Sequence, residues 1–317
     1  MALTDAIRYF TDDTHILASM AIACGTCDQS VQALGGVRDS EGTPITDDTI
    51  YDLASLTKLV TGLLTYRLVD EGLLSLSRKV TDYAPQFTML QGLTVDQILG
   101  FEIGLVTPER VDTQPDAHRA QDMLFRIAPK DIGYGRAYSD MHAMVIKYVL
   151  ETASGMPYME LLRSRIMDPL GLTLYCHVPD TLRSLCSVCD GEHRFEKGKY
   201  LVRHGIRPGE PHDPKARTLN LTGEDCPGHA GLFGTLTDIA CLAQGVLSGK
   251  VISDSSLRAM ARNRTGRPSP DGGWTQFLGS LCYVKHPVAY HSEVPCYMGN
   301  RAIAISGFTG HHLSIDP

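Results

Sequence analysis

The stretch Tyr51-Asp52-Leu53-Ala54-Ser55-Leu56-Thr57-Lys58-Leu59-Val60 holds the residues around which the rest of the chain can be interpreted. After Ser55 the apolar residues recur at helical spacing, which predicts a helix that starts near Ser55 and buries one stripe (Leu56, Leu59, Val60, Leu63, Leu64 and Leu68). Residues three positions apart lie one turn from each other, so the amine of Lys58 can reach the hydroxyl of Ser55. Burial disfavours the charged form of a lysine, and a neutral amine can accept the proton of a serine. This stretch therefore predicts a nucleophile and its base.

A Ser-x-x-Lys spacing also occurs in ordinary helices, where the serine caps the helix and the lysine points to solvent. Here, however, Lys58 is the only charged residue between Asp52 and Arg67. A lysine inside so apolar a helix favours the catalytic interpretation.

The composition is that of an ordinary globular protein, and we expect its partners to be small molecules or none. The chain has 317 residues, 43% of them hydrophobic, which is enough for one large domain or two. Its formal net charge of −7, without a run of Lys or Arg, gives no basic surface for nucleic acid. The longest apolar run, Ile16 to Cys24, is too short to cross a bilayer, and the N-terminus lacks a signal sequence. We expect no membrane segment and a cytoplasmic location.

The cysteines agree with a reducing compartment, because an odd number, nine, is scattered along the chain. Two C-x-x-C pairs, Cys24/Cys27 and Cys186/Cys189, leave a four-thiolate zinc site as an alternative. The pairs are far apart in sequence, and residues 24–27 have the composition of a hairpin turn. We therefore expect neither a metal nor a cofactor.

The order of the expected elements indicates an α+β fold. Residues 81 to about 225 combine helical patterns with long loops and little strand signal, whereas strand patterns occur near both ends of the chain. This order predicts one antiparallel sheet from both ends, flanked by helices, with 1–80 and 225–317 as a sheet domain and 81–224 as an inserted, mostly helical domain. The expected helices are 3–11, 55–71, 94–99, 141–155, 158–169, 235–247 and 252–261, and the expected strands 16–23, 30–37, 277–284, 302–306 and 312–315.

Three short segments carry a resemblance to a known family. Ser55-Leu56-Thr57-Lys58, Tyr138-Ser139-Asp140 and Ile305-Ser306-Gly307 resemble, in order and spacing, the three motifs of the serine β-lactamase and penicillin-binding protein superfamily. The closest branch is the class C β-lactamase-like one that includes family VIII carboxylesterases. Residues 212–216, 228–233 and 307–310 also resemble stretches that are frequent in that branch. The resemblance implies a β-lactamase/transpeptidase-like fold.

The resemblance also assigns catalytic roles. Ser55 would attack a carbonyl to form an acyl-enzyme, while Lys58 and Tyr138 share its proton and pass it to the leaving group. A nearby ammonium would favour the phenolate of Tyr138, although a half-buried aromatic at the start of a helix is the plainer interpretation of that residue. The backbone amides of Ser55 and Phe308 would point at the developing oxyanion.

The chain departs from the superfamily pattern at several of these positions. Asp140 stands where many relatives have Asn; it can accept a hydrogen bond from Lys58 or cap the helix that follows it. Ile305 replaces a residue that is commonly Lys, His or Trp, and Ser306, before Gly307, offers one hydroxyl. Without a cation here, an uncharged substrate is favoured over a carboxylate. Phe101 and Ile103 likewise replace polar residues.

These observations predict a serine hydrolase that acts on an uncharged ester, or an amide, through an acyl-Ser55 intermediate. The alternatives are a β-lactamase, a D-amino-acid peptidase or an acyltransferase, with a small-molecule ester, amide or lactam as substrate. A non-catalytic binding or sensor module on the same fold is the competing class. His229 could line the site, but a His in a Gly-rich turn more often binds backbone groups.

The C-terminus gives one further expectation. Chains of the superfamily usually continue beyond the position of Pro317 with another strand and a long helix on the sheet. A second copy of the chain could cover the apolar surface left without them, which makes a homo-oligomer an expectation and puts the activity of the chain ending at Pro317 in question.

Overall fold

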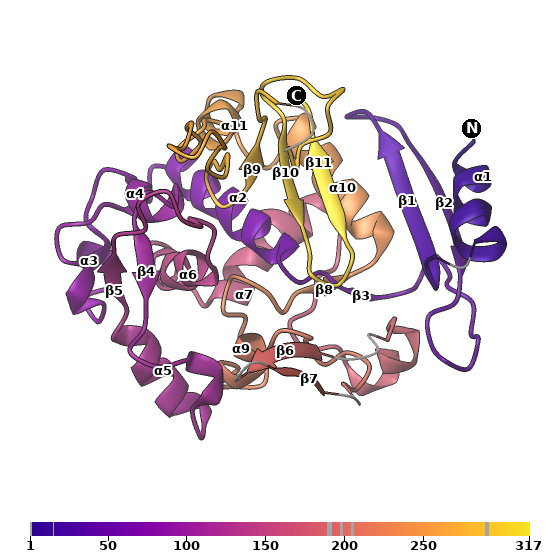
Figure 1. The fold of residues 1–317 in the computed structure, drawn as a ribbon, viewed down its shortest axis with the longest axis horizontal. Coiled ribbons are helices and arrows are strands. Elements are labelled where there is room, and N and C mark those ends of the chain that lie inside the picture. Colours follow the sequence, from indigo (N-terminus) through magenta and orange to yellow (C-terminus); the bar gives the residue numbers. More distant parts are fainter. Residues whose placement is uncertain (1, 15, 189–191, 197–198, 204–205, 289–291) are drawn as a thin grey trace.

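Helices and short strands alternate along the chain, of which the computed structural model describes residues 2–14, 16–188, 192–196, 199–203, 206–288 and 292–317 (Figure 1). The α-helices are α1 (Leu3–Arg8), α2 (Leu56–Asp70), α3 (Val80–Tyr83), α4 (Val95–Leu99), α5 (Ala117–Phe125), α6 (Asp140–Ser154), α7 (Tyr158–Leu162), α8 (Asp168–Leu170), α9 (Pro214–Thr218), α10 (Leu236–Leu247) and α11 (Asp254–Met260). The strands are β1 (Ser19–Gly25), β2 (Ser30–Gly36), β3 (Tyr51–Asp52), β4 (Gly104–Val106), β5 (Ala128–Lys130), β6 (Glu192–Glu196), β7 (Lys199–Arg203), β8 (Phe233–Gly234), β9 (Tyr283–Val284), β10 (Ile303–Ser306) and β11 (His312–Ile315). Short 3₁₀ or π turns occupy η1 (Tyr9–Asp13), η2 (Thr88–Leu90), η3 (Val111–Thr113), η4 (Arg163–Met167) and η5 (Asp180–Leu185).

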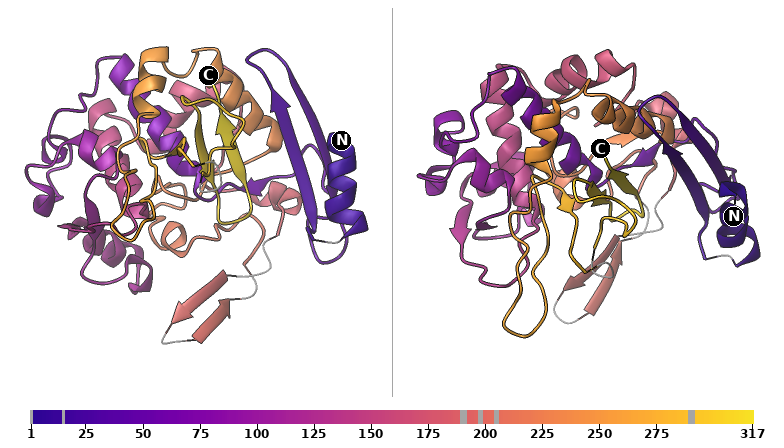
Figure 2. Two further views of the ribbon diagram at one scale, coloured as in Figure 1. Left: turned by 45° about the horizontal axis from the view of Figure 1, so that its top comes forward. Right: turned by 90° about the horizontal axis from the view of Figure 1, so that it is seen from above.

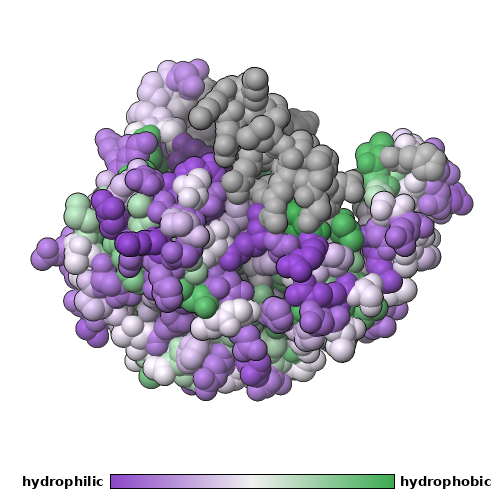
Figure 3. Space-filling model, turned by 90° about the horizontal axis from the view of Figure 1, so that it is seen from below, coloured by the Kyte–Doolittle hydropathy of each residue, from purple (hydrophilic) through white to green (hydrophobic). Residues whose placement is uncertain are grey.

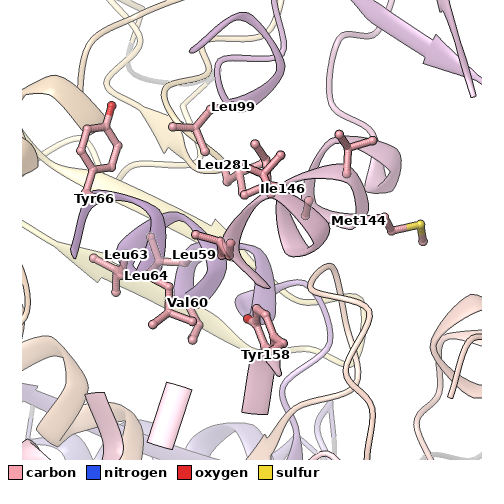
Figure 4. Packing of buried hydrophobic residues seen from close by; sticks show 14 of the residues in the cluster. Leu59, Val60, Leu63, Leu64, Tyr66, Leu99, Met144, Ile146, Tyr158 and Leu281 are labelled. Atoms are coloured by element: carbon pink, nitrogen blue, oxygen red, sulfur yellow. The ribbon is translucent and has the colours of Figure 1, made fainter. Parts of the chain in front are cut away.

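The predicted Ser55 helix is α2, and it runs through the middle of the apolar core. It is buried on nearly all sides rather than along one stripe, because α6 and α11 pack against it. Figure 4 shows Leu59, Val60 and Leu63 of α2 among side chains from other elements. The helix ends at Glu71, and Gly72 follows with a φ of +72°, a conformation that favours glycine.

The other predicted helices are confirmed, with shifted ends. Thr94 caps α4 and Thr235 caps α10, since each side-chain oxygen accepts the backbone N–H three residues on. Gly155 ends α6 in the left-handed conformation, with a φ of +70°. The predicted helix 158–169 is α7, η4 and α8 in succession. Local sequence signals of this kind are readable because the groups that satisfy a helix end lie within one turn of it.

The strands from the two ends of the chain form separate sheets, where one sheet was predicted. β1 pairs antiparallel with β2, and β9, β10 and β11 form a three-stranded antiparallel sheet in the order β11-β10-β9. In Figures 1 and 2 the β1–β2 hairpin stands at one side with α1, and α10 packs against both β1 and β11. The predicted strand 277–284 shortens to β9, because Leu281 has a φ of +55° and interrupts the extended backbone.

The region 81–224 is largely helical, but it contains more strand than predicted. β4 pairs with β5 and β6 pairs with β7, each as an antiparallel two-stranded sheet. A further short pair joins β3 to β8, so that Asp52 lies opposite Phe233. That pair brings the residues before Ser55 next to those that follow His229. The division into a sheet domain and an inserted helical domain stays a prediction.

One face of the molecule shows how apolar and polar residues are distributed at the surface. On the face shown in Figure 3, the apolar residues that are not covered by grey atoms are mostly scattered among polar ones. None of the described helices is both long enough and apolar enough to cross a bilayer. The cytoplasmic location and the homo-oligomer stay predictions.

Candidate active site

Ser55 and Lys58 are brought together at the start of α2. Ser55 directly precedes the helix, but its side chain does not cap it. Instead its Oγ lies 2.8 Å from the Nζ of Lys58. Ser55 is partly exposed, whereas Lys58 is completely buried. The alternative of a capping serine with a solvated lysine is therefore wrong, and the hydroxyl is both accessible and in contact with an amine.

Lys58 has an acceptor for each of its three N–H bonds. In addition to Ser55, Nζ contacts Oδ1 of Asp140 at 2.8 Å and the carbonyl oxygen of His229 at 3.2 Å. Burial acts to lower the pKa of Lys58, but the attraction of Asp140 and then of Tyr138 outweighs it and holds the pKa above its usual value. The expectation of a neutral amine in the resting protein is therefore wrong: a buried lysine stays charged when a carboxylate lies at hydrogen-bond distance.

Tyr138 lies beside this ammonium, clamped between two other rings. The Nζ of Lys58 is 5.0 Å from the centroid of the Tyr138 ring. That ring stacks on Phe101 at 5.6 Å and on Tyr283 at 5.3 Å. Its backbone N–H also donates to Gln276. Phe101, which replaces a polar residue of the superfamily pattern, thus supports Tyr138 by stacking.

Asp140 bridges two lysines and does not cap α6. The cap is Ser139, whose Oγ accepts the N–H of Met141. Of the two carboxylate oxygens of Asp140, Oδ1 contacts Lys58 and Oδ2 lies 2.9 Å from the Nζ of Lys215. Burial acts to raise the pKa of Asp140, but Lys58, His229 and Lys215 hold it well below its usual value. The carboxylate is therefore ionised at neutral pH.

Asp213, Lys215 and His229 also belong to the site; the sequence analysis weighed His229 as a residue that could line it, but gave Asp213 and Lys215 no role. Oδ1 of Asp213 accepts the N–H of Ala216, which caps α9, and lies 2.9 Å from Nε2 of His229. Lys215, on α9, also reaches Oδ2 of Asp213 at 3.7 Å. Both segments, 212–216 and 228–233, resembled stretches of the superfamily. The signal that could have found them was the presence of three polar side chains, a carboxylate, an ammonium and an imidazole, in these two segments. The sequence assigned none of them a binding partner.

The third motif lies against the residues that precede Ser55. A side chain at Gly307 would place its Cβ 3.0 Å from the carbonyl oxygen of Leu53, so the backbones touch here. Thr309 adds a hydrogen bond from its Oγ1 to the carbonyl oxygen of Asp52, at 2.7 Å. The ring of Phe308 is 73% exposed, which leaves its backbone amide as the group of interest. The oxyanion hole formed by the amides of Ser55 and Phe308 stays a prediction.

Ile305 and Ser306 point to opposite faces of β10. Ile305 is completely buried in the apolar core, because alternate residues of a strand face opposite sides. It packs against the apolar core, and the substrate-binding or supporting role expected for it stays a prediction. The hydroxyl of Ser306 donates to Glu293, an exposed carboxylate, at 2.9 Å.

One group of potential metal ligands occurs among the described residues. One oxygen or nitrogen atom from each of Asp140, Asp213 and His229 lies within 4.8 Å of the others. The two carboxylates already bind the ammonium groups of Lys58 and Lys215, which supply the positive charge that a cation would bring. Cys24 and Cys27 lie exposed at the β1–β2 turn, and Cys189 lies outside the described residues.

Comparison with known proteins identifies the family. The Beta-lactamase family model matches residues 4–317. The chain belongs to the beta-lactamase family. The fold is the β-lactamase/transpeptidase-like one that the motifs implied.

Individual relatives are distant. A putative D-alanyl-D-alanine carboxypeptidase of Escherichia coli (strain K12) is 27% identical over 253 residues, covering 70% of this chain and 56% of that protein, so the chain spans little more than half of its length. A penicillin-binding protein homologue from Caulobacter crescentus has a TM-score of 0.76 at 21% identity, with 99% of this chain and 87% of that one covered. EstCE1, a hydrolase with promiscuous acyltransferase activity, has a TM-score of 0.73 at 17% identity, with 99% and 89% covered. At these identities the structural likeness shows the fold.

Proposed function

We propose that this protein is a serine hydrolase that cleaves an uncharged ester, or an amide, through an acyl-enzyme on Ser55. The observation that carries the proposal is the 2.8 Å contact between Ser55 Oγ and Lys58 Nζ, with Tyr138 beside the same ammonium. A nucleophile next to a base, held in place by a third group, is the arrangement that nucleophilic catalysis requires.

The charge of Lys58 decides how the proton moves in the proposed reaction. As an ammonium, Lys58 donates to Ser55 Oγ and cannot accept its proton, so we assign the role of base to Tyr138, whose ring lies beside the same ammonium. The oxygen of Ser55 attacks the carbonyl carbon while Tyr138, which this step requires as a phenolate, takes the proton. The amides of Ser55 and Phe308 hold the oxyanion until the leaving group departs with the proton from Tyr138. Water then enters, and the same groups act in reverse to release the acid.

Glu293 supports an uncharged substrate. Its carboxylate accepts a hydrogen bond from Ser306. After burial and Tyr138, it also helps to raise the pKa of Tyr283, whose ring stacks on Tyr138. A substrate carboxylate bound along β10 would therefore meet a group of like charge.

Arg136 favours a second candidate, the β-lactamase or D-amino-acid peptidase. Its guanidinium lies 5.6 Å from the centroid of the Tyr138 ring, and no described residue forms an ion pair with it. It could hold a substrate carboxylate, which suits the name of the Escherichia coli relative. Acyl transfer to an alcohol or amine, as in the name of EstCE1, would use the same acyl-enzyme. A protein that only binds a ligand would not need a buried, charged lysine in contact with its serine hydroxyl. This contact therefore weighs against a non-catalytic binding module.

The test is intact-protein mass spectrometry after treatment with a fluorophosphonate, together with turnover of p-nitrophenyl butyrate, a chromogenic cephalosporin and a D-alanyl-D-alanine peptide. We expect one adduct and ester turnover in the wild type, neither in Ser55→Ala, and both in Ser77→Ala, an exposed serine far from the site. Preference for the cephalosporin or the peptide would instead support the second candidate. A folded wild type that takes no label and turns over no substrate would contradict the proposal.

A further inference from the structure

Lys58 and four other residues form a closed ring of contacts, which we call the lysine–carboxylate ring. Lys58 contacts Asp140 at 2.8 Å, Asp140 contacts Lys215 at 2.9 Å, and Lys215 reaches Asp213 at 3.7 Å. Asp213 contacts the ring of His229 at 2.9 Å, and the carbonyl oxygen of His229 accepts from Lys58 at 3.2 Å. The members come from α2, α6, α9 with its cap, and the turn before β8. The ring thus connects the residue beside the nucleophile to three other parts of the chain.

Lys215 is the member that has no contact with the nucleophile and yet shares a carboxylate with Lys58. Asp140 gives one oxygen to each ammonium, so neither lysine has this carboxylate to itself. Burial acts to lower the pKa of Lys215, but Asp140 and then Asp213 raise it above its usual value, so that it stays charged. The two ammonium groups therefore alternate with the two carboxylates in the ring.

We propose that Lys215 is a positioning residue that sets the pH at which the Ser55–Lys58–Tyr138 unit becomes reactive, by compensating the charge of Asp140. The inference rests on the proposed hydrolase function. Acylation requires the unit to lose a proton, which makes it more negative. Removal of the positive charge of Lys215 would oppose that loss, and removal of the negative charge of Asp140 would favour it. The sign is the same whether the proton leaves Tyr138 or Lys58.

The other charges that face Lys215 do not reverse this sign. Besides Asp140 on α6 and Asp213 before α9, the remaining carboxylate that acts on it is Asp112 in η3, which already pairs with Arg110 at 2.6 Å. Lys58 on α2 lies on the far side of Asp140, and His229 contacts Asp213 rather than Lys215.

The test compares the pH dependence of two rates, fluorophosphonate labelling of Ser55 and kcat/KM for p-nitrophenyl butyrate. The variants are Lys215→Met, Asp140→Asn and the charge-balanced double variant. In both profiles the rate rises with pH on the acid side, and we call this rise the acid limb. We expect the acid limb to shift to a pH higher by about 1 unit in Lys215→Met and to a lower pH in Asp140→Asn. In the double variant it should return close to the wild-type position, and in Lys215→Arg it should stay there.

Lys147 provides the matched control, because it is also buried between two carboxylates, Glu151 at 3.1 Å and Asp225 at 3.2 Å, but outside the ring. Lys147→Met should lose stability without moving the limb. A slower rate in Lys215→Met at every pH, with an unmoved limb, would overturn the inference and leave the hydrolase function intact. If Lys215→Met does not fold, the double variant is compared with Asp140→Asn instead. An acid limb at the same pH in these two variants would also overturn the inference. A wild type that neither takes label nor turns over ester would overturn the function and the inference together.

Discussion

Ala54, the residue before the nucleophile, has a φ of +44° and so lies in the left-handed region that L-residues disfavour. Such a conformation costs about 1–2 kcal/mol, which surrounding contacts must offset. The carboxylate of Asp52 supplies two: Oδ1 accepts the N–H of Ala54 at 2.9 Å, and Oδ2 accepts the N–H of His212 at 2.6 Å. Asp52 therefore fixes the backbone that presents Ser55 and ties it to the segment that carries Asp213 and Lys215.

Asp52→Asn should be more harmful than its near-identical shape suggests. An amide offers one oxygen, so one of the two buried N–H groups would face an NH₂ donor and lose its acceptor. We expect a loss of about 2 kcal/mol in the free energy of unfolding, measured in urea, and slower labelling of Ser55. Asp48→Asn, at an exposed position nearby, should change neither. Equal stability of the two variants would show that Asp52 does not hold the turn.

At the scale of elements, the site depends on how closely the β10–β11 hairpin approaches the start of α2. Gly307 touches the carbonyl of Leu53, and its N–H bonds to His311 within the hairpin at 2.7 Å. The turn of the hairpin is thus fixed on one side to its own strand and on the other to the residues before Ser55. The predicted oxyanion amide of Phe308 follows Gly307 directly, so its position relative to Ser55 depends on this contact.

Gly307→Ala should separate the hairpin from α2 by a few tenths of an ångström. Because a small misplacement of reacting groups is costly, we expect kcat/KM for the ester to fall by about 10- to 100-fold with little change in the thermal midpoint. The control is Gly310→Asn in the same hairpin, where a Cβ would meet no atom within 4 Å, so that the φ of +92° adds backbone strain without a steric contact. An unchanged kcat/KM in Gly307→Ala would argue against the predicted oxyanion hole.

For the whole molecule, stability is unevenly distributed between the core and the N-terminal hairpin. No residue of β1 or β2 is fully buried, whereas α2 and α6 contribute most of their residues to the core. In Figure 2 the hairpin lies at the edge of the protein in both views, where α10 packs against it. Local opening requires less free energy where fewer apolar contacts are lost.

Amide hydrogen exchange followed by mass spectrometry should show this difference. We expect β1 and β2 to exchange at least tenfold faster than α2 and α6 under native conditions, since the hairpin can open without unfolding the core. The exposed turn at residues 26–29 provides the fast reference. Equal protection of hairpin and core would mean that the molecule opens as one unit.

The elements that the sequence predicted well are those whose signals are local. The spacing of apolar residues located α2. Thr94, and either Thr235 or Thr237, were the candidate helix starts, of which Thr94 and Thr235 are the caps, and Gly72 and Gly155 marked helix ends. The separation of the two sheets was not predicted, because strand pairing between the ends of a chain has no local signal. The strands β4 to β7 were missed for a related reason, as each is only three to five residues long.

The site divides in the same way. Ser55 and Lys58 were readable because one helical turn joins them, and the motif order supplied Tyr138 and Asp140. The charge of Lys58 was not readable, since it depends on a carboxylate 82 positions away coming within 2.8 Å (140 − 58). Lys215 escaped notice because its partners lie in other elements. Alternate residues of β10 face opposite sides, so either Ile305 or Ser306 had to face the core. Which of the two is buried could be stated only once the face of β10 that meets the core was known.

The closed ring around Lys58 also has a consequence for synthesis of the chain on the ribosome. The contact from Lys58 to the carbonyl of His229 spans 171 positions, and that from Thr61 to the carbonyl of Gly228 spans 167. When α2 first emerges, Lys58 lacks the distant acceptors whose contacts offset the cost of burying its charge. A growing chain that has not reached residue 229 cannot complete the lysine–carboxylate ring, so the contacts that hold Lys58 beside Ser55 form only after residues 228 and 229 have been made.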